Sequence, residues 1–153
     1  TKKKGYIHPL KLKGHVKYEL LDKNGKIKKE WEVDNLVVDA GLAFICSRMA
    51  GTSASVMSHM GVGSGTTAAA AGQTDLVSIL GSREPLDSTT VGSNTITFVC
   101  ALGAGEGTGA TTESAIFNAS SGGTMLARVV FPVVNKAAVD VMNITHTLTL
   151  TSS

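Results

Sequence analysis

The fold is decided by the stretch His15-Val16-Lys17-Tyr18-Glu19-Leu20, followed by Asn24-Gly25 and by residues 27–33 (IKKEWEV). Apolar residues alternate with polar ones in the first segment, and the second interleaves Ile, Trp and Val with lysines and glutamates. Because successive side chains of a strand point to opposite faces, this alternation places one apolar face on a core. Asn-Gly supplies the positive φ angles that a tight turn requires. The sequence therefore predicts a β-hairpin over residues 15–33.

A short amphipathic helix is predicted directly after the hairpin, over about residues 39–50. Asp39 is a favourable N-cap residue, and Gly51 can close the helix. Apolar residues recur at the spacing i, i+3, i+4 and i+7, which is typical of one helix face. That face is expected to pack against the sheet through Leu42, Ile45, Cys46 and Met49.

The remaining chain is rich in Gly, Thr, Ser and Val, and its regular segments have the pattern of strands. Strands are predicted at residues 56–62, 95–100, 115–117, 125–134 and 139–151. The expected fold is mainly β: one antiparallel β-sandwich or jelly-roll-like domain over residues 14–153. The expected core residues are Val16, Tyr18, Leu20, Trp31, Leu42, Ile45, Phe98, Phe117, Phe131, Ile144 and Leu148. Cys46 and Cys100 are also expected to be buried, as small hydrophobic residues.

Residues 1–13 (TKKKGYIHPLKLK) are predicted to form an extended basic arm, because Pro9 disfavours helix before it. Residues 1–30 carry a net charge of +7 and residues 31–153 a net charge of −5. Two interpretations are open: a solvated lysine-rich face, or an arm that docks on an acidic neighbour. The candidate partner-binding residues of the arm are Lys2, Lys3, Lys4, Tyr6, Lys11 and Lys13.

Membrane and secretion signals are not expected. No apolar run of eighteen residues occurs, and the basic N-terminal residues lead into polar ones, unlike a secretory signal. We therefore expect synthesis in the cytoplasm, with an initiator Met removed before Thr1.

The sequence offers no motif for catalysis, and no cofactor, metal or small-molecule substrate is expected. Residues 61–67 lack the lysine of a nucleotide-binding loop, and residues 103–109 lack the G-x-G-x-x-G spacing. No G-x-S-x-G elbow occurs, and the four histidines and two cysteines have no zinc-like spacing. Trp31 has no aromatic cluster for sugar stacking, and no nucleic-acid-binding motif is present, so nucleic acid is an improbable partner. We expect a binding protein and not an enzyme.

Three groups of segments together resemble a known class of protein. The first is Asn35-Leu36-Val37-Val38-Asp39-Ala40-Gly41-Leu42. The second comprises residues 60–67 (MGVGSGTT), 74–76 (TDL) and Arg83-Glu84. The third comprises residues 113–118 (ESAIFN) and 123–128 (GTMLAR), with Phe131, Lys136 and a Thr-rich C-terminal strand. In this order they resemble small virion structural proteins of tailed bacteriophages, namely capsid cement (decoration) proteins and related tail or fibre-associated modules.

The resemblance covers roughly residues 35–150 and implies a β-sandwich or jelly-roll module that oligomerises on the virion. The implied function is that of a cement protein, which binds the major capsid protein across capsomer junctions on the outer head surface and stabilises the shell. The alternative is a tail, baseplate or fibre-associated component of the same kind of virion. The expected partners are the major capsid protein and further copies of the chain itself, as a dimer or trimer.

Overall fold

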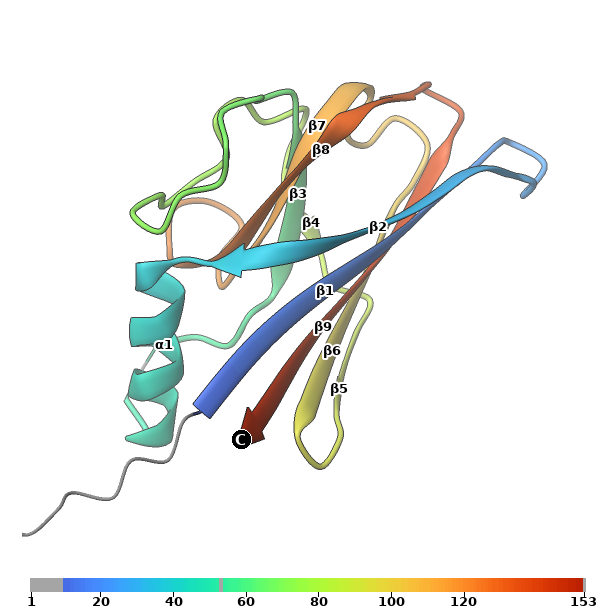
Figure 1. Ribbon diagram of the computed structural model, residues 1–153. Coiled ribbons are helices and arrows are strands. Elements are labelled where there is room, and N and C mark those ends of the chain that lie inside the picture. Colours follow the sequence, from blue (N-terminus) through green and yellow to red (C-terminus); the bar gives the residue numbers. More distant parts are fainter. Residues whose placement is uncertain (1–9, 53, 153) are drawn as a thin grey trace, which may run out of the picture.

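The computed structural model describes residues 10–52 and 54–152, and these form nine strands and one helix (Figure 1). All strand pairs are antiparallel, so the predicted mainly β, sandwich-like fold is confirmed. The elements are β1 (Leu10–Leu21), β2 (Ile27–Val37), α1 (Asp39–Met49), β3 (His59–Gly63), β4 (Glu84–Pro85), β5 (Ser88–Val91), β6 (Thr95–Leu102), β7 (Gly109–Phe117), β8 (Met125–Lys136) and β9 (Val141–Ser152).

The strands form one curled sheet in the order β4-β3-β7-β8-β2-β1-β9-β6-β5. Strand β2 joins its two halves, because it pairs with β1 over most of its length and with β8 through Leu36 and Val37. The outermost strands, β4 and β5, are separated in the chain only by Leu86 and Asp87. Leu86 N–H donates to Ser58 O beside β3, and Asp87 N–H donates to Val99 O in β6. The chain therefore links both edges, and the two halves enclose a common core.

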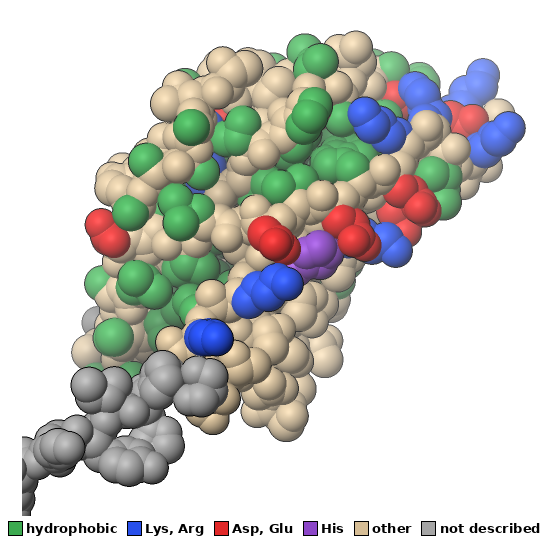
Figure 2. All heavy atoms as spheres, viewed as in Figure 1, with side chains coloured by type: hydrophobic (Ala, Val, Ile, Leu, Met, Phe, Trp, Pro, Cys, Tyr) green, Lys and Arg blue, Asp and Glu red, His purple; other side chains and the backbone are tan. Residues whose placement is uncertain are grey.

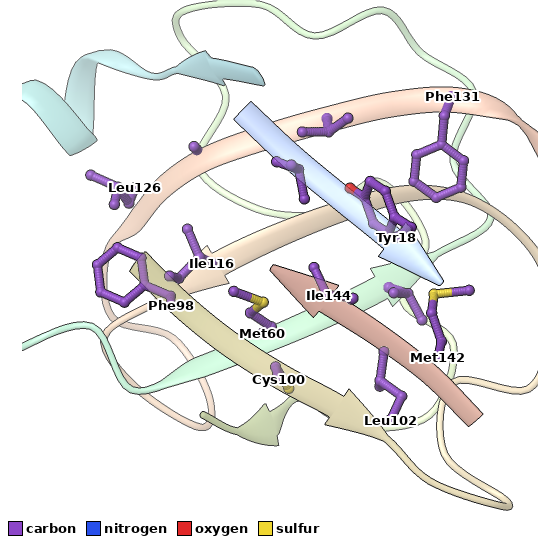
Figure 3. Close-up of a cluster of buried hydrophobic side chains, with 14 of the residues drawn as sticks. Tyr18, Met60, Phe98, Cys100, Leu102, Ile116, Leu126, Phe131, Met142 and Ile144 are labelled. Atoms are coloured by element: carbon purple, nitrogen blue, oxygen red, sulfur yellow. The ribbon is translucent and has the colours of Figure 1, made fainter. Parts of the chain in front are cut away.

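Side chains from both halves meet in this core (Figure 3). Of the eleven predicted core residues, eight are buried, Trp31 and Ile45 are partly buried, and Leu42 is exposed. Tyr18 stacks on Trp31 with ring centroids 4.8 Å apart, and Phe131 packs against both rings. Burying each large apolar side chain contributes about 1.5–3 kcal/mol.

The predicted hairpin is confirmed and extends beyond residues 15–33 at both ends. Its inward alternation gives the pairs Val16–Val33 and Tyr18–Trp31. The turn differs from the expectation, because Gly25 has a φ of 78° whereas Asn24, like every described residue other than glycine, has a negative φ. The Asp22 carboxylate instead accepts from the N–H groups of Asn24 (2.8 Å) and Lys26 (3.0 Å). The Asp22 carboxylate thus satisfies two main-chain N–H groups of a loop that is wider than a two-residue turn with two positive φ angles.

Helix α1 has nearly the predicted length, but the predicted cap is wrong, and of the predicted packing face only Ile45 packs against the core. Val38 is the N-cap residue and Asp39 lies in the first turn, with no side-chain cap. The helix approaches β8 through Gly41, where a Cβ atom would lie 2.2 Å from Leu126 O. This close contact turns Phe44 and Ile45 inward and leaves the other predicted packing residues exposed: Leu42, Cys46 and Met49. Cys46 is therefore not a core residue, whereas Cys100 is buried as expected.

The later strands agree with the predicted segments in place but not in length. Strand β7 starts at Gly109, six residues before the predicted segment, and β3 starts at His59, three residues after the predicted Val56. The two edge strands, β4 and β5, have only two and four residues and were not predicted. Such short strands carry too little alternation to be recognised.

Candidate partner-binding surface

The residues of the predicted arm lie partly within the sheet. Lys11 and Lys13 belong to β1, where they pair with Thr151 and Thr149 of β9. Lys2, Lys3, Lys4 and Tyr6 lie outside the described residues. The segment that can act as an arm is therefore limited to residues 1–9, because Leu10 already pairs with Ser152.

An apolar groove of about 660 Å³ opens beside the start of β1. One wall is α1, and the floor comes from the inner faces of β1, β6 and β9, including Leu12, Ile96 and Leu148. Among the described residues, Arg48 is its one charged lining residue, and Arg48 donates to Ala54 O at 2.7 Å. Figure 2 shows apolar side chains gathered over α1 on this face. The groove exposes large apolar residues at its rim: Met49, Val56, Val91 and Leu150.

The strand edge next to the groove has no partner among the described strands. Pairing between β1 and β2 begins at Gly14 and Asn35, so the stretch from Leu10 to Lys13 pairs only with β9. In an antiparallel strand, alternate residues direct both N–H and C=O to the same side. Two of these four residues therefore point their main-chain groups away from β9, towards the side where Figure 1 shows α1. Such an edge can accept an added strand.

The outer face of the β1–β2 hairpin is charged and largely self-paired (Figure 2). His15 contacts Asp34 (Nδ1 to Oδ1, 2.9 Å) and Glu32 (Nε2 to Oε2, 3.3 Å). The hydrogen bond to Asp34, helped by Glu32, raises the pKa of His15. Lys28 Nζ lies 2.8 Å from the buried Asp140 carboxylate and lowers its pKa. The lysines at the hairpin tip are exposed: Lys23, Lys26 and Lys29.

Three of the segments that carry the phage resemblance, residues 60–67, 113–118 and 123–128, meet around a buried ion pair. Arg128 Nη2 lies 2.8 Å from Glu113 Oε2, and both side chains are fully buried. Glu113 also accepts from the N–H groups of Gly65, Val77 and Ser78. Burial opposes ionisation of Glu113, but these hydrogen bonds outweigh it and lower its pKa. Glu113 and Arg128 thus serve the folding of the loop between β3 and β4.

A second structural arginine holds the other end of the same loop. The Arg83 guanidinium lies 3.4 Å from the centre of the Phe117 ring and donates to Ala119 O and Gly122 O. Its Nη2 atom is also 3.3 Å from Asp75 Oδ1. Arg83 is therefore held by structural contacts, and its nearly buried side chain is not directed at solvent.

Histidines and cysteines do not converge in the part of the chain that the structure describes. Within residues 10–52 and 54–152, no three His, Cys, Asp or Glu side chains are placed to hold a metal ion. His59 contacts Ser58 Oγ at 2.8 Å, and the buried His146 contacts Asn35. Burial and neighbouring carboxylates raise the pKa of Cys100 to about 12, so its thiol is protonated at neutral pH.

Comparisons of the chain with protein-family models, curated proteins and solved structures found no match. The resemblance to phage virion proteins therefore rests on the sequence motifs alone. Within the described residues, the single helix is too short to cross a membrane.

The groove and the strand edge were not found from the sequence. Lining residues come from five separated parts of the chain, around residues 12, 44–57, 89–98, 126 and 148–150. One signal in the sequence was the presence of more apolar residues on the helix than one face can bury. If Phe44 is buried, part of the face formed by Leu42, Ile45, Cys46 and Met49 has to be exposed. The competing apolar residues are the signal from which an exposed apolar surface could have been predicted in this region.

Proposed function

We propose that this chain is a non-catalytic structural module of a tailed-bacteriophage virion, bound to the outer head surface as a cement protein. The observation that carries a binding function is the apolar groove beside an unpaired strand edge. Exposed apolar surface of this kind marks protein interaction sites. The assignment to the phage head is supported by the sequence resemblance.

A cement protein needs a rigid body with surfaces left free for neighbours. The curled sheet has a continuous core, and the ion pair of Glu113 and Arg128 fixes its longest loop. Modest contacts repeated over a closed shell add up through avidity, so no single contact has to be strong. The groove with the adjoining edge of β1, and the basic hairpin tip, are two separate surfaces with which such a module can bind neighbouring proteins.

The test is a cryo-EM comparison of purified particles with and without the chain. Loss of density at regular sites over the head, together with fragile heads, supports the cement function. Intact heads with density lost at the tail would identify a tail component instead. Absence of the chain from all particles would contradict a virion function of either kind.

The arm can be tested on the same particles by deleting residues 1–9, which leaves every described strand intact. The expected result is weaker occupancy of the head by a normally folded protein. Unchanged occupancy would show that the arm does not bind the shell. The deletion has to stop at residue 9, because a deletion of residues 1–13 would also remove the pairing of Leu10–Lys13 with β9.

A further inference from the structure

Two incompletely used features lie next to each other at one end of the molecule. The groove has an apolar floor and an exposed rim, and Leu12 of β1 is part of its lining. The edge of β1 from Leu10 to Lys13 has no strand partner on the groove side. A segment that covers both must offer main-chain hydrogen bonds to the edge and apolar side chains to the groove.

We infer that this segment is the N-terminal segment, residues 1–9, of a second copy of the chain. It adds as an antiparallel strand to Leu10–Lys13 and lays apolar side chains over the groove. Two copies exchange their segments around a two-fold axis, so that each gives one segment and receives one. The inference goes beyond the proposed function, because it concerns an association of the chain with itself that does not depend on a virion.

The composition of residues 1–9 fits this role. Tyr6 and Ile7 are adjacent apolar residues, so in an extended segment one of them faces the groove whichever face is turned inward. Pro9 fixes its own φ and disfavours the helical region for His8, which favours an extended segment. A proline is tolerated in an edge strand where its missing N–H faces away from the neighbour.

The place where the segment joins the sheet favours a second copy over the same copy. Residues 1–9 precede Leu10, which is the first residue of β1 and is 71% exposed. The direction of β1, followed from Lys13 back to Leu10, leads away from the groove of its own chain. To enter that groove, the segment would have to reverse direction within the few residues around Pro9. The corresponding segment of a two-fold related copy runs antiparallel to β1 without any reversal.

The charges of the segment also support an antiparallel arrangement. A segment antiparallel to β1 carries Lys2, Lys3 and Lys4 past Lys13, towards the point where β2 leaves β1. Two exposed carboxylates lie at that point: Asp34 near the end of β2, which also contacts His15, and Asp39 at the start of α1. The three lysines of the incoming segment therefore approach acidic groups, whereas the groove itself contains only Arg48 as a charged lining residue.

The experiment is sedimentation velocity of the full chain over a range of concentrations, with two matched lysine variants of α1. Met49 is 82% exposed and lines the groove, whereas Leu42 is 45% exposed on the same helix and is not part of the lining. We expect the unmodified chain and Leu42→Lys to dimerise alike. Met49→Lys should weaken dimerisation by about tenfold or more, because a lysine beside the basic segment opposes its docking. Deletion of residues 1–9 should abolish dimerisation.

Mixing distinguishes exchange between copies from binding within one copy. Met49→Lys retains its N-terminal segment, and the deleted chain retains its groove. An equimolar mixture should therefore contain a heterodimer at concentrations at which each protein alone is monomeric. Circular dichroism of each variant checks that the fold is kept. A chain that stays monomeric at all concentrations, a dimer that survives the deletion, or equal weakening by Leu42→Lys and Met49→Lys would overturn the inference.

Discussion

Arg128 of β8 donates from Nε to Glu113 of β7 at 2.9 Å, and neither side chain is exposed to solvent. The pair also reaches into the long segment between β3 and β4. Arg128 donates to Thr67 O and to Gln73 Oε1, and Glu113 accepts from three main-chain N–H groups of that segment. One ion pair thereby orders residues 65–78, which belong to no strand.

Replacing Arg128 by Met should destabilise the fold by about 3–5 kcal/mol, because the Glu113 carboxylate is left buried without its cation. Urea denaturation measures this loss. Lys17→Met is the matched control, because Lys17 Nζ lies 3.8 Å from Glu19 at the surface and such pairs contribute about 1 kcal/mol or less. A stability of Arg128→Met within the range of this control would show that the pair is not structurally important.

The double variant Glu113→Gln with Arg128→Met gives a separate test of coupling. With the negative charge also removed, the combined loss should be smaller than the sum of the two single losses. Additive losses would mean that the two residues act on the loop independently.

Gly41→Ala should destabilise the protein by about 1–3 kcal/mol, the usual range for overpacking. A Cβ atom at residue 41 meets the main chain of β8 at Leu126, which cannot move aside as a flexible side chain would. The change would otherwise favour the helix by about 1 kcal/mol. Gly72→Ala is the control, because no atom lies within 4 Å of its Cβ position and its φ is not positive. Thermal denaturation of both variants checks the expectation, and a stabilised Gly41→Ala protein would contradict it.

Tyr18→Phe should cost about 1–3 kcal/mol, because it leaves the buried Ser114 hydroxyl without a partner. The Tyr18 hydroxyl lies 2.5 Å from Ser114 Oγ between the two halves of the sheet. Adding Ser114→Ala removes the unpaired group and should restore part of the lost stability. Denaturation of the single and double variants measures the difference. A double variant less stable than Tyr18→Phe would refute this explanation.

Local patterns predicted the hairpin and the last strands well, because their alternation is set by a core on one side. Tertiary contacts decided the rest. The face of α1 follows from the approach of Gly41 to Leu126, which no helical periodicity reveals. The groove could be predicted only after α1 and the β5–β6 hairpin had been placed relative to each other. Glu113 and Arg128 gave a usable signal, because each is a lone charge within a small or apolar strand sequence, GATTESAIF and MLARVVF. Such charges predict a buried pair once the two strands are known to be neighbours.

Acidification should weaken the fold through His146. This side chain is buried, and burial lowers its pKa from 6.5 to about 4. The unfolded chain takes up a proton near pH 6.5, while the folded chain stays neutral until about pH 4. Stability is therefore fully present above pH 6.5 and falls as the pH decreases towards 4, by about 3 kcal/mol at 1.36 kcal/mol per pH unit.

The measurement is the free energy of unfolding in urea at intervals between pH 7 and 4, for the unmodified chain and for His146→Gln. The variant loses the contact with Asn35 and should be less stable at pH 7, but its stability should vary much less over this interval. His15→Gln is the control, because the pKa of His15 is raised and its titration acts in the opposite direction. Equal slopes for the unmodified chain and His146→Gln would show that His146 is not the group that titrates.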